Sequence, residues 1–211
     1  MIWNDHSKLE GLHAFLGASQ FHWINWSDET LEQRFYSRYS TEIGTAIHKL
    51  AEDCIKSRMK LNKQDKHLVD ITLYHAFIPK GAYDSEAILT NLMPFVNDAI
   101  GFHMSSEVIL YYSDYCFGTT DAISFSEKEK VLRIHDLKTG SIPAHMEQLM
   151  IYAALFCLEY HKDPHNFTTE LRIYQNYEVL IDNPNPDDIR KFMDLIVRSN
   201  TLVNNIRERN A

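Results

Sequence analysis

The spacing of apolar positions predicts two long amphipathic helices in the first half of the chain. From about residue 42 to 60, apolar side chains recur every three or four positions, which is the helical period with one buried stripe. This stripe consists of Ile43, Ala46, Ile47, Leu50, Ala51, Cys54, Ile55 and Met59. The same period returns from about 86 to 101, so a second helix should also bury one face.

After residue 107 the pattern changes to short β-branched and aromatic runs. These runs predict a three-stranded meander, with strands at 107–112, 115–117 and 131–135. Further along, the predicted elements are a helix at 146–160, a strand at 170–174 and a helix at 185–207. This succession predicts an α/β or α+β layer in which helices flank a central mixed sheet.

Two carboxylates and a lysine are expected to meet at the end of one strand. Asp136 and Lys138 should project from the same face because side chains alternate along a strand, and Gly140 ends it. Asp121 lies 15 residues before Asp136, enough for one hairpin connection, so it can sit on the neighbouring strand. Paired carboxylates suit Mg²⁺ or Mn²⁺ and phosphate esters, whose charge a lysine can stabilise. The alternative is a surface Asp–Lys pair of small energetic value.

Three further polar residues could face the same strand end. His48 lies on the edge of the first helix's stripe, and Gly44, one turn earlier, leaves space for an ion or for another strand. In that setting His48 is a candidate metal ligand; otherwise it is a histidine at the core boundary. Gln148 and Tyr152 share one face of the following helix and could bind phosphate oxygens or a base, or form an ordinary polar boundary.

Four short motifs, in this order along the chain, resemble those of the PD-(D/E)XK nuclease superfamily, in its RecB-like exonuclease branch. They span about residues 41 to 155 and are Gly44 to His48, Gly118-Thr-Thr-Asp121, Asp136-Leu-Lys138 and Gln148 to Tyr152. The resemblance implies a restriction-endonuclease-like α/β core with a central mixed sheet flanked by helices.

The resemblance also implies a role for each position. The metal ligands would be His48, Asp121, Asp136 and the backbone carbonyl of Leu137, and the catalytic residues would be Asp121, Asp136 and Lys138. The residues in contact with the nucleic-acid strand would be Gln148 and Tyr152. Glu107 and Glu52 are candidates for positions beside the ligands. The cofactor would be Mg²⁺ or Mn²⁺.

Length and charge limit how these motifs can be organised. A chain of 211 residues predicts a single domain, with the motifs in a core at about 41–175. An N-terminal helical segment at 1–40 and the C-terminal helix at about 185–207 should pack on that core. The net charge of −8 restricts nucleic-acid contact to a local surface. The preferred interpretation of the basic stretch at 56–66 is a solvated helix end.

The cysteines and the apolar runs bear on cofactors and location. Many relatives in the resembling family carry four cysteines for an iron–sulfur cluster, whereas this chain has three, so no cluster is predicted. The longest wholly apolar run has ten residues, too few for a membrane span of about 20. Nothing at the N-terminus directs export, so a cytoplasmic protein is expected, in the host cytoplasm if it is encoded by a phage.

The leading hypothesis is a metal-dependent DNA nuclease that hydrolyses phosphodiester bonds with a metal-activated water. Its expected partner is DNA, as a single strand or a duplex end, with a homo-oligomer or a recombination protein also possible. Exonuclease is the first choice of mode and endonuclease stays open. The alternatives are a non-catalytic module of the same fold that binds nucleic acid or protein, and an α/β domain whose acids are surface charges.

Overall fold

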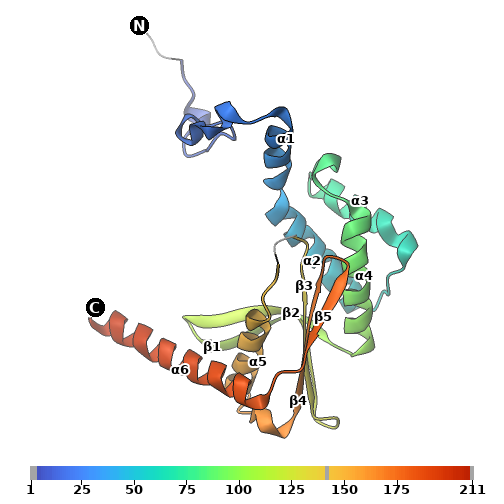
Figure 1. Ribbon diagram of the computed structural model, residues 1–211, viewed down its shortest axis with the longest axis vertical. Helices are drawn as coiled ribbons and strands as arrows, with labels where there is room; N and C mark the ends of the chain where they lie inside the picture. The colour runs from blue at the N-terminus through green and yellow to red at the C-terminus, as the bar shows by residue number, and fades with distance from the viewer. Residues whose placement is uncertain (1–3, 141–142, 210–211) are drawn as a thin grey trace.

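The protein is an α/β protein built on a five-stranded mixed sheet (Figure 1), seen in a computed structural model that describes residues 4–140 and 143–209. The strands are β1 (Ser105–Ser113), β2 (Cys116–Ser126), β3 (Val131–Leu137), β4 (Thr168–Gln175) and β5 (Glu178–Asp182). They lie in this order across the sheet, and neighbours are antiparallel except for β3 and β4, which are parallel. The predicted mixed sheet flanked by helices is confirmed.

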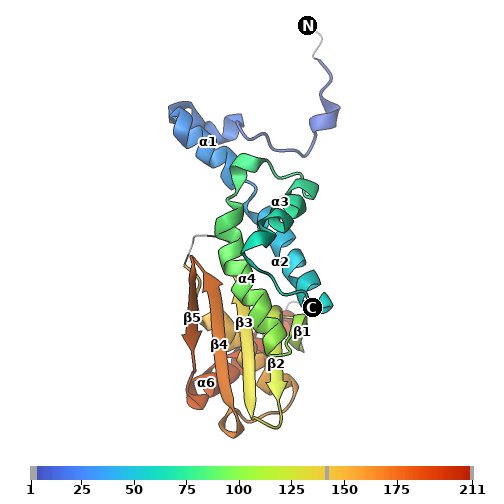
Figure 2. The same ribbon diagram turned by 90° about the vertical axis from the view of Figure 1, so that its right-hand side faces the viewer.

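Helices cover both faces of the sheet (Figures 1 and 2). On one face α2 (Ser40–Ser57) and α4 (Ser85–Gly101) pack together, with α3 (Lys66–His75) against both. On the other face α5 (Glu147–Glu159) crosses from β3 to β4 and contacts α6 (Pro186–Arg209). Two hydrophobic clusters result, one beneath α2 and α4 and one beneath α5 and α6. The apolar stripes predicted from periodicity are therefore the buried faces of these helices.

One helix and one strand of the described residues were not predicted, and another strand is longer than expected. The helix α3 and the strand β5 had no predicted counterpart, and the predicted helical segment at 1–40 contains the single α-helix α1 (Asp28–Ser37) before α2 begins, within the described residues. β2 continues nine residues beyond the predicted end at 117, so Asp121 lies inside a paired strand. β5 follows a two-residue turn, Asn176 and Tyr177, in which both residues have positive φ, as a type I′ hairpin requires. Because glycine is absent from that turn, the usual sequence signal of a tight hairpin is missing.

The N-terminal segment differs from the expectation that it packs on the core. None of residues 4–37 is buried, and Ala18–Asn25 form an irregular 3₁₀ helix. Figure 1 shows this segment standing away from the sheet, joined to α2 through α1. At the other end, Ile189 and Ile196 bury the first half of α6. Its last turns project beyond the sheet (Figure 1).

Membrane insertion of a helix finds no support in the described part of the chain. Across residues 4–140 and 143–209, no helix combines the length and the apolar character that crossing a bilayer requires.

Candidate metal centre and active site

The candidate site lies where β2 and β3 stop pairing. The ladder between them ends at the pair Ala122 and His135, and beyond it Leu137 pairs with Tyr174 of β4. The carboxylate of Asp121 bridges the gap: the backbone N–H of Leu137 donates a 2.7 Å hydrogen bond to its Oδ2. The second carboxylate oxygen of Asp121 therefore remains available at the opening between the two strands.

His48 reaches this opening from α2. Its Nδ1 lies 3.3 Å from Oδ1 of Asp121, and its side chain is about a third exposed. Gly44 brings the helix close to the end of β3, since a Cβ there would lie 3.4 Å from Oγ1 of Thr139. The space at Gly44 is therefore bordered by the segment that follows β3.

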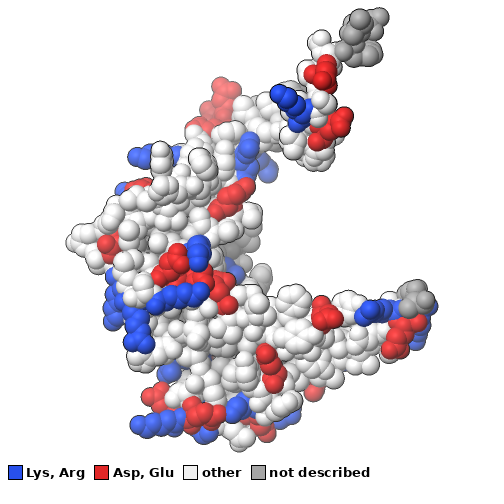
Figure 3. Space-filling view, turned by 180° about the vertical axis from the view of Figure 1, so that it is seen from behind, with Lys and Arg blue, Asp and Glu red and all other residues white. Residues whose placement is uncertain are grey.

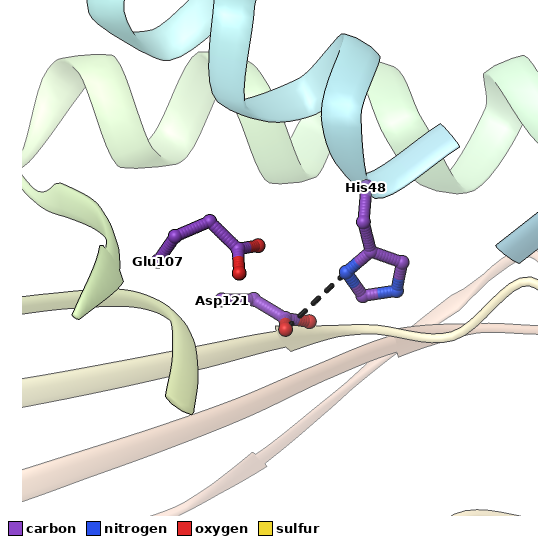
Figure 4. A group of neighbouring side chains, drawn as sticks. All are labelled: His48, Glu107 and Asp121. Carbon is purple, nitrogen blue, oxygen red and sulfur yellow. Dashed lines mark ion pairs between the residues drawn. The ribbon is translucent and has the colours of Figure 1, made fainter. Parts of the chain in front are cut away.

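Glu107 joins these two residues from the start of β1. The ligand atoms of His48, Glu107 and Asp121 all lie within 4.8 Å of one another (Figure 4). The register of the β1–β2 ladder sets Glu107 opposite Asp121, since Ser106 pairs with Ala122 and Val108 with Thr120. Glu107 has a φ of 52°, in the left-handed region that non-glycine residues rarely adopt. A costly backbone conformation thus accompanies the placement of its carboxylate beside Asp121.

Asp136 and Lys138 form the second half of the site. The ammonium Nζ of Lys138 lies 2.9 Å from Oδ2 of Asp136, which itself is buried. The same ammonium donates to Oε1 of Gln148 at 3.0 Å, and Nε2 of Gln148 donates to the Tyr152 hydroxyl at 3.2 Å. A chain of polar contacts therefore links the end of β3 to α5 and holds Lys138 between two partners.

Tyr152 packs against the backbone of β2. A Cβ added to Gly118 would lie 2.8 Å from Cε1 of Tyr152, closer than such contacts occur. Glycine at this position thus allows the ring to lie against the strand three residues before Asp121. The Gly118-Thr-Thr-Asp121 motif therefore needs glycine at its first position because the Tyr152 ring of α5 occupies the space of a Cβ.

The electrostatics of the site show an excess of negative charge. Burial, followed by the charge of Asp121, raises the pKa of Asp136 to about 6 despite the nearby Lys138. Burial and the same charge also raise the pKa of Glu107. Burial opposes protonation of His48, but the hydrogen bond to Asp121 and the surrounding carboxylates outweigh it and raise the pKa of the imidazole. Each shift favours a proton at the site, and a bound cation would relieve the same repulsion.

The structure also shows the surroundings of the two remaining predicted residues, Leu137 and Glu52. Leu137 presents its backbone N–H to Asp121, as described above. Glu52 lies on α2 and forms ion pairs with Lys49, at 2.8 Å, and with Lys56. Its carboxylate is therefore paired with two lysines, and it does not belong to the converging ligand atoms of His48, Glu107 and Asp121, although its charge helps to raise the pKa of Glu107. Sequence reasoning placed Glu107 only beside the ligands, and no local pattern distinguishes it from other glutamates.

The donor set suits a divalent cation. One imidazole nitrogen and two carboxylates, from His48, Glu107 and Asp121, can converge on one ion, and Asp136 is near enough for its charge to couple with that of Asp121. Oxygen donors fit Mg²⁺ and Mn²⁺, and the imidazole adds a ligand that transition metals accept more readily. The residues present therefore fit the cofactor implied by the resemblance.

The cysteines lie apart from this site. Cys54 belongs to the hydrophobic cluster beneath α2 and α4, whereas Cys116 and Cys157 lie with the cluster beneath α5 and α6. Burial raises the pKa of Cys54 to about 11 and that of Cys157 to about 12, so both thiols stay protonated. They are small core residues in this fold, and the absence of an iron–sulfur cluster stays a prediction.

Comparisons with known proteins leave the family open. No family model matches the sequence, and no curated protein matches it. The solved structure described as "Crystal structure of SSO0001" is similar at 9% sequence identity, over 72% of this chain and 84% of that one, with a TM-score of 0.32. A likeness at that score carries no argument about fold or function.

Proposed function

We propose that the protein is a metal-dependent nuclease that hydrolyses phosphodiester bonds in DNA, with a PD-(D/E)XK-type fold of the RecB-like branch. The observation that carries this proposal is the convergence of His48, Glu107 and Asp121 beside the Asp136–Lys138 pair, at a gap between two strands. Exonuclease is the preferred mode, and the cytoplasm is the proposed location.

Each residue has a defined part in the proposed reaction. His48, Glu107 and Asp121 would hold the divalent ion, with Asp136 as a further carboxylate at its edge. When bound, such an ion supplies Lewis acidity toward the phosphate and lowers the pKa of water. The ammonium of Lys138 offsets negative charge that develops on the phosphate oxygens. Asp136 and Gln148 orient that ammonium through the contacts that they already make.

Cleavage assays test this proposal directly. Purified protein is incubated with end-labelled single-stranded DNA, linear duplex or closed circular DNA, in Mn²⁺, Mg²⁺ or EDTA. We expect metal-dependent loss of linear DNA, abolished in Lys138→Ala and in Asp136→Ala. Lys191→Ala is the matched control, since this lysine pairs with Asp188 on the surface of α6. Cutting of circles would make the enzyme an endonuclease, and equal activity in all variants would refute the assignment.

A non-catalytic module of the same fold is the second candidate. The net charge of −8 favours its protein-binding form, because an acidic protein repels most of a polyanion outside its local binding surface. DNA binding without cleavage in either metal would support this candidate over the nuclease. In that case the contact between Lys138 and Asp136 would serve stability alone.

A further inference from the structure

The end of β4 forms a fixed support beside the candidate site. Tyr174 is buried, and its hydroxyl donates a 2.7 Å hydrogen bond to Oδ2 of Asp98 on α4. Gln175 is the last residue of the strand. In the turn that follows, the backbone N–H of Tyr177 donates to Oδ1 of Asn91, also on α4, at 2.9 Å. The chain is therefore anchored to the same helix on both sides of Gln175.

The side-chain amide of Gln175 holds the segment that leads from β3 to α5. Its Nε2 donates a 2.7 Å hydrogen bond to the backbone carbonyl of Gly140, and its Oε1 accepts a 3.0 Å hydrogen bond from the backbone N–H of Ala144. A buried amide whose donor and acceptor both have partners is kept in one orientation. One neutral group therefore joins two points of this segment to the end of β4.

The two points that Gln175 holds lie next to the groups proposed to act in catalysis. Gly140 comes two residues after Lys138, whose backbone N–H is itself hydrogen-bonded to β4 at 3.0 Å. Ala144 comes four residues before Gln148, whose Oε1 accepts from Nζ of Lys138 at 3.0 Å. The contact between Lys138 and Gln148 thus joins the end of β3 to the start of α5. The segment that Gln175 holds is the covalent connection between these two elements.

Gln175 lies beneath the surface that a substrate can reach. Figure 3 shows a deep hollow between the N-terminal segment with α1 and the arm that ends in α6, and in Figure 1 α5 lies on this side, between the same two parts. The side chain of Lys138 is partly exposed, whereas Gln175 is only 5% exposed. An effect of Gln175 on the reaction must therefore pass through the residues that it holds.

We propose that Gln175 is a positioning residue, which fixes the start of α5 relative to the end of β3 so that Gln148 meets the ammonium of Lys138. A lysine side chain has a long flexible stem, so its ammonium needs partners in fixed places. Asp136 shares a strand with Lys138 and follows its movements, whereas Gln148 belongs to another element and depends on this support. The inference rests on the proposed nuclease function, in which Lys138 offsets charge on the phosphate.

The variant Gln175→Met tests this role. Methionine has a similar length but offers no donor and only a weak acceptor to the backbone of Gly140 and Ala144. With an end-labelled single strand in Mn²⁺, we expect kcat to fall about tenfold while KM stays within about twofold, because a small misplacement of Lys138 affects the transition state more than binding. A rise in KM without a loss of kcat would contradict a positioning role.

A second amide that clamps backbone provides the matched control. Asn97 on α4 accepts from the backbone N–H of Leu61 and donates to its carbonyl, both at 2.8 Å. Asn97→Leu therefore loses the same two kinds of hydrogen bond as Gln175→Met, and urea unfolding compares the stabilities of the two variants. We expect Asn97→Leu to keep the kcat of the parent protein. An equal loss of kcat in both variants would show that Gln175 acts only through general stability.

A double variant distinguishes positioning from an independent effect. If Gln175 acts through the contact between Lys138 and Gln148, Gln175→Met combined with Gln148→Leu should have a kcat within about twofold of Gln148→Leu alone. Independent effects would instead multiply. Multiplied losses in the double variant, or an unchanged kcat in Gln175→Met, would overturn the inference.

The two proposals fail separately, because the contact can also be followed without a reaction. In isotope-labelled protein, the NMR signals of the Gln148 side-chain amide should shift in Gln175→Met and stay in place in Asn97→Leu. If the parent protein cleaves no DNA in Mn²⁺ or Mg²⁺, the nuclease proposal fails, and this shift alone decides whether Gln175 fixes the contact. If the parent cleaves DNA and Gln175→Met retains its kcat, the nuclease stands and the positioning role fails.

Discussion

The backbone N–H of Leu137 donates a 2.7 Å hydrogen bond to the carboxylate of Asp121, at the point where β2 and β3 cease to pair. The same carboxylate meets the imidazole of His48 through its other oxygen. Asp121 therefore has two roles at once, since it satisfies a buried backbone donor at a strand separation and presents an oxygen to the opening. The candidate metal centre therefore depends on the separation of β2 and β3, because the same carboxylate belongs to both.

Substitution by alanine is expected to destabilise the protein at Gly118 but not at Gly44. Gly118→Ala places a Cβ 2.8 Å from Tyr152, so the ring must move, and overpacking of this kind costs about 1–3 kcal/mol. Gly44→Ala meets only Thr139 at 3.4 Å and should stabilise α2 by up to about 1 kcal/mol. Urea unfolding of both variants checks this prediction. Equal stability of the two variants would contradict it.

Glu107 should contribute directly to cation affinity. Glu107→Gln keeps the size of the side chain but removes a charged oxygen from the group with His48 and Asp121, so Mn²⁺ affinity should fall at least about tenfold. Isothermal titration with Mn²⁺ measures this loss. Glu52→Gln is the matched control, because that carboxylate is already paired with Lys49 and Lys56. If the two variants lose affinity equally, Glu107 acts only through general charge.

Gln148 should affect turnover more than substrate binding. Gln148→Leu removes the acceptor of Lys138, leaving Asp136 as its partner, so we expect kcat to fall about tenfold or more with a small change in KM. Initial rates on an end-labelled single strand in Mn²⁺ give both constants. Gln33→Leu, on the exposed surface of α1, should match the parent protein. A rise in KM alone would instead indicate direct contact between Gln148 and the strand.

His135 should make the protein sensitive to acid. Burial, together with Arg172 and Arg133, lowers the pKa of this imidazole to about 3, from an ordinary value of 6.5. The folded state therefore holds it neutral, and its contribution to stability is present above pH 6.5 and is lost as the pH falls toward 3. Between pH 6.5 and 5 we expect a loss of about 2 kcal/mol from this group.

The variant His135→Phe separates the effect of His135 on acid sensitivity from that of Asp136. Asp136 acts in the opposite direction between pH 4 and 6, since its raised pKa lets the folded state bind a proton that the unfolded state releases. His135→Phe fills the same space against Phe102 without titrating. The difference in unfolding free energy between pH 7.5 and 5 should shrink in this variant. An unchanged difference would show that His135 does not set the acid sensitivity.

Much of the fold could be predicted from periodicity, and the failures have physical reasons. The predicted helix at 42–60 matches α2 within a few residues because it buries a continuous apolar face. The predicted helix at 146–160 matches α5 because helix-forming residues run without a break up to the stop before Pro164. Helix α3 was missed because Val69 and Leu73 are its only buried residues, which leaves a weak periodic signal. Strand β5 was missed because all five of its residues are exposed and its turn lacks glycine.

The candidate site could be predicted in part. Asp136 and Lys138 were expected on one face of a strand, and the structure pairs them. Asp121 was expected on the neighbouring strand, and it lies in β2. Glu107 could not be assigned, because its place depends on a left-handed backbone and on the register that sets it opposite Asp121. Such relationships are tertiary, and no spacing along the chain encodes them.

If the proposed metal centre binds a cation, the 3.3 Å contact between His48 and Asp121 makes a proton and that metal ion competitors. The contact raises the pKa of His48 against the opposing effect of burial, whereas a cation needs the neutral imidazole. Each ion that enters must therefore displace a proton whenever His48 is charged. The heat of Mn²⁺ binding will then vary with the ionisation enthalpy of the buffer, and affinity will fall by up to about tenfold per pH unit below that pKa. Acidification alone would empty the centre.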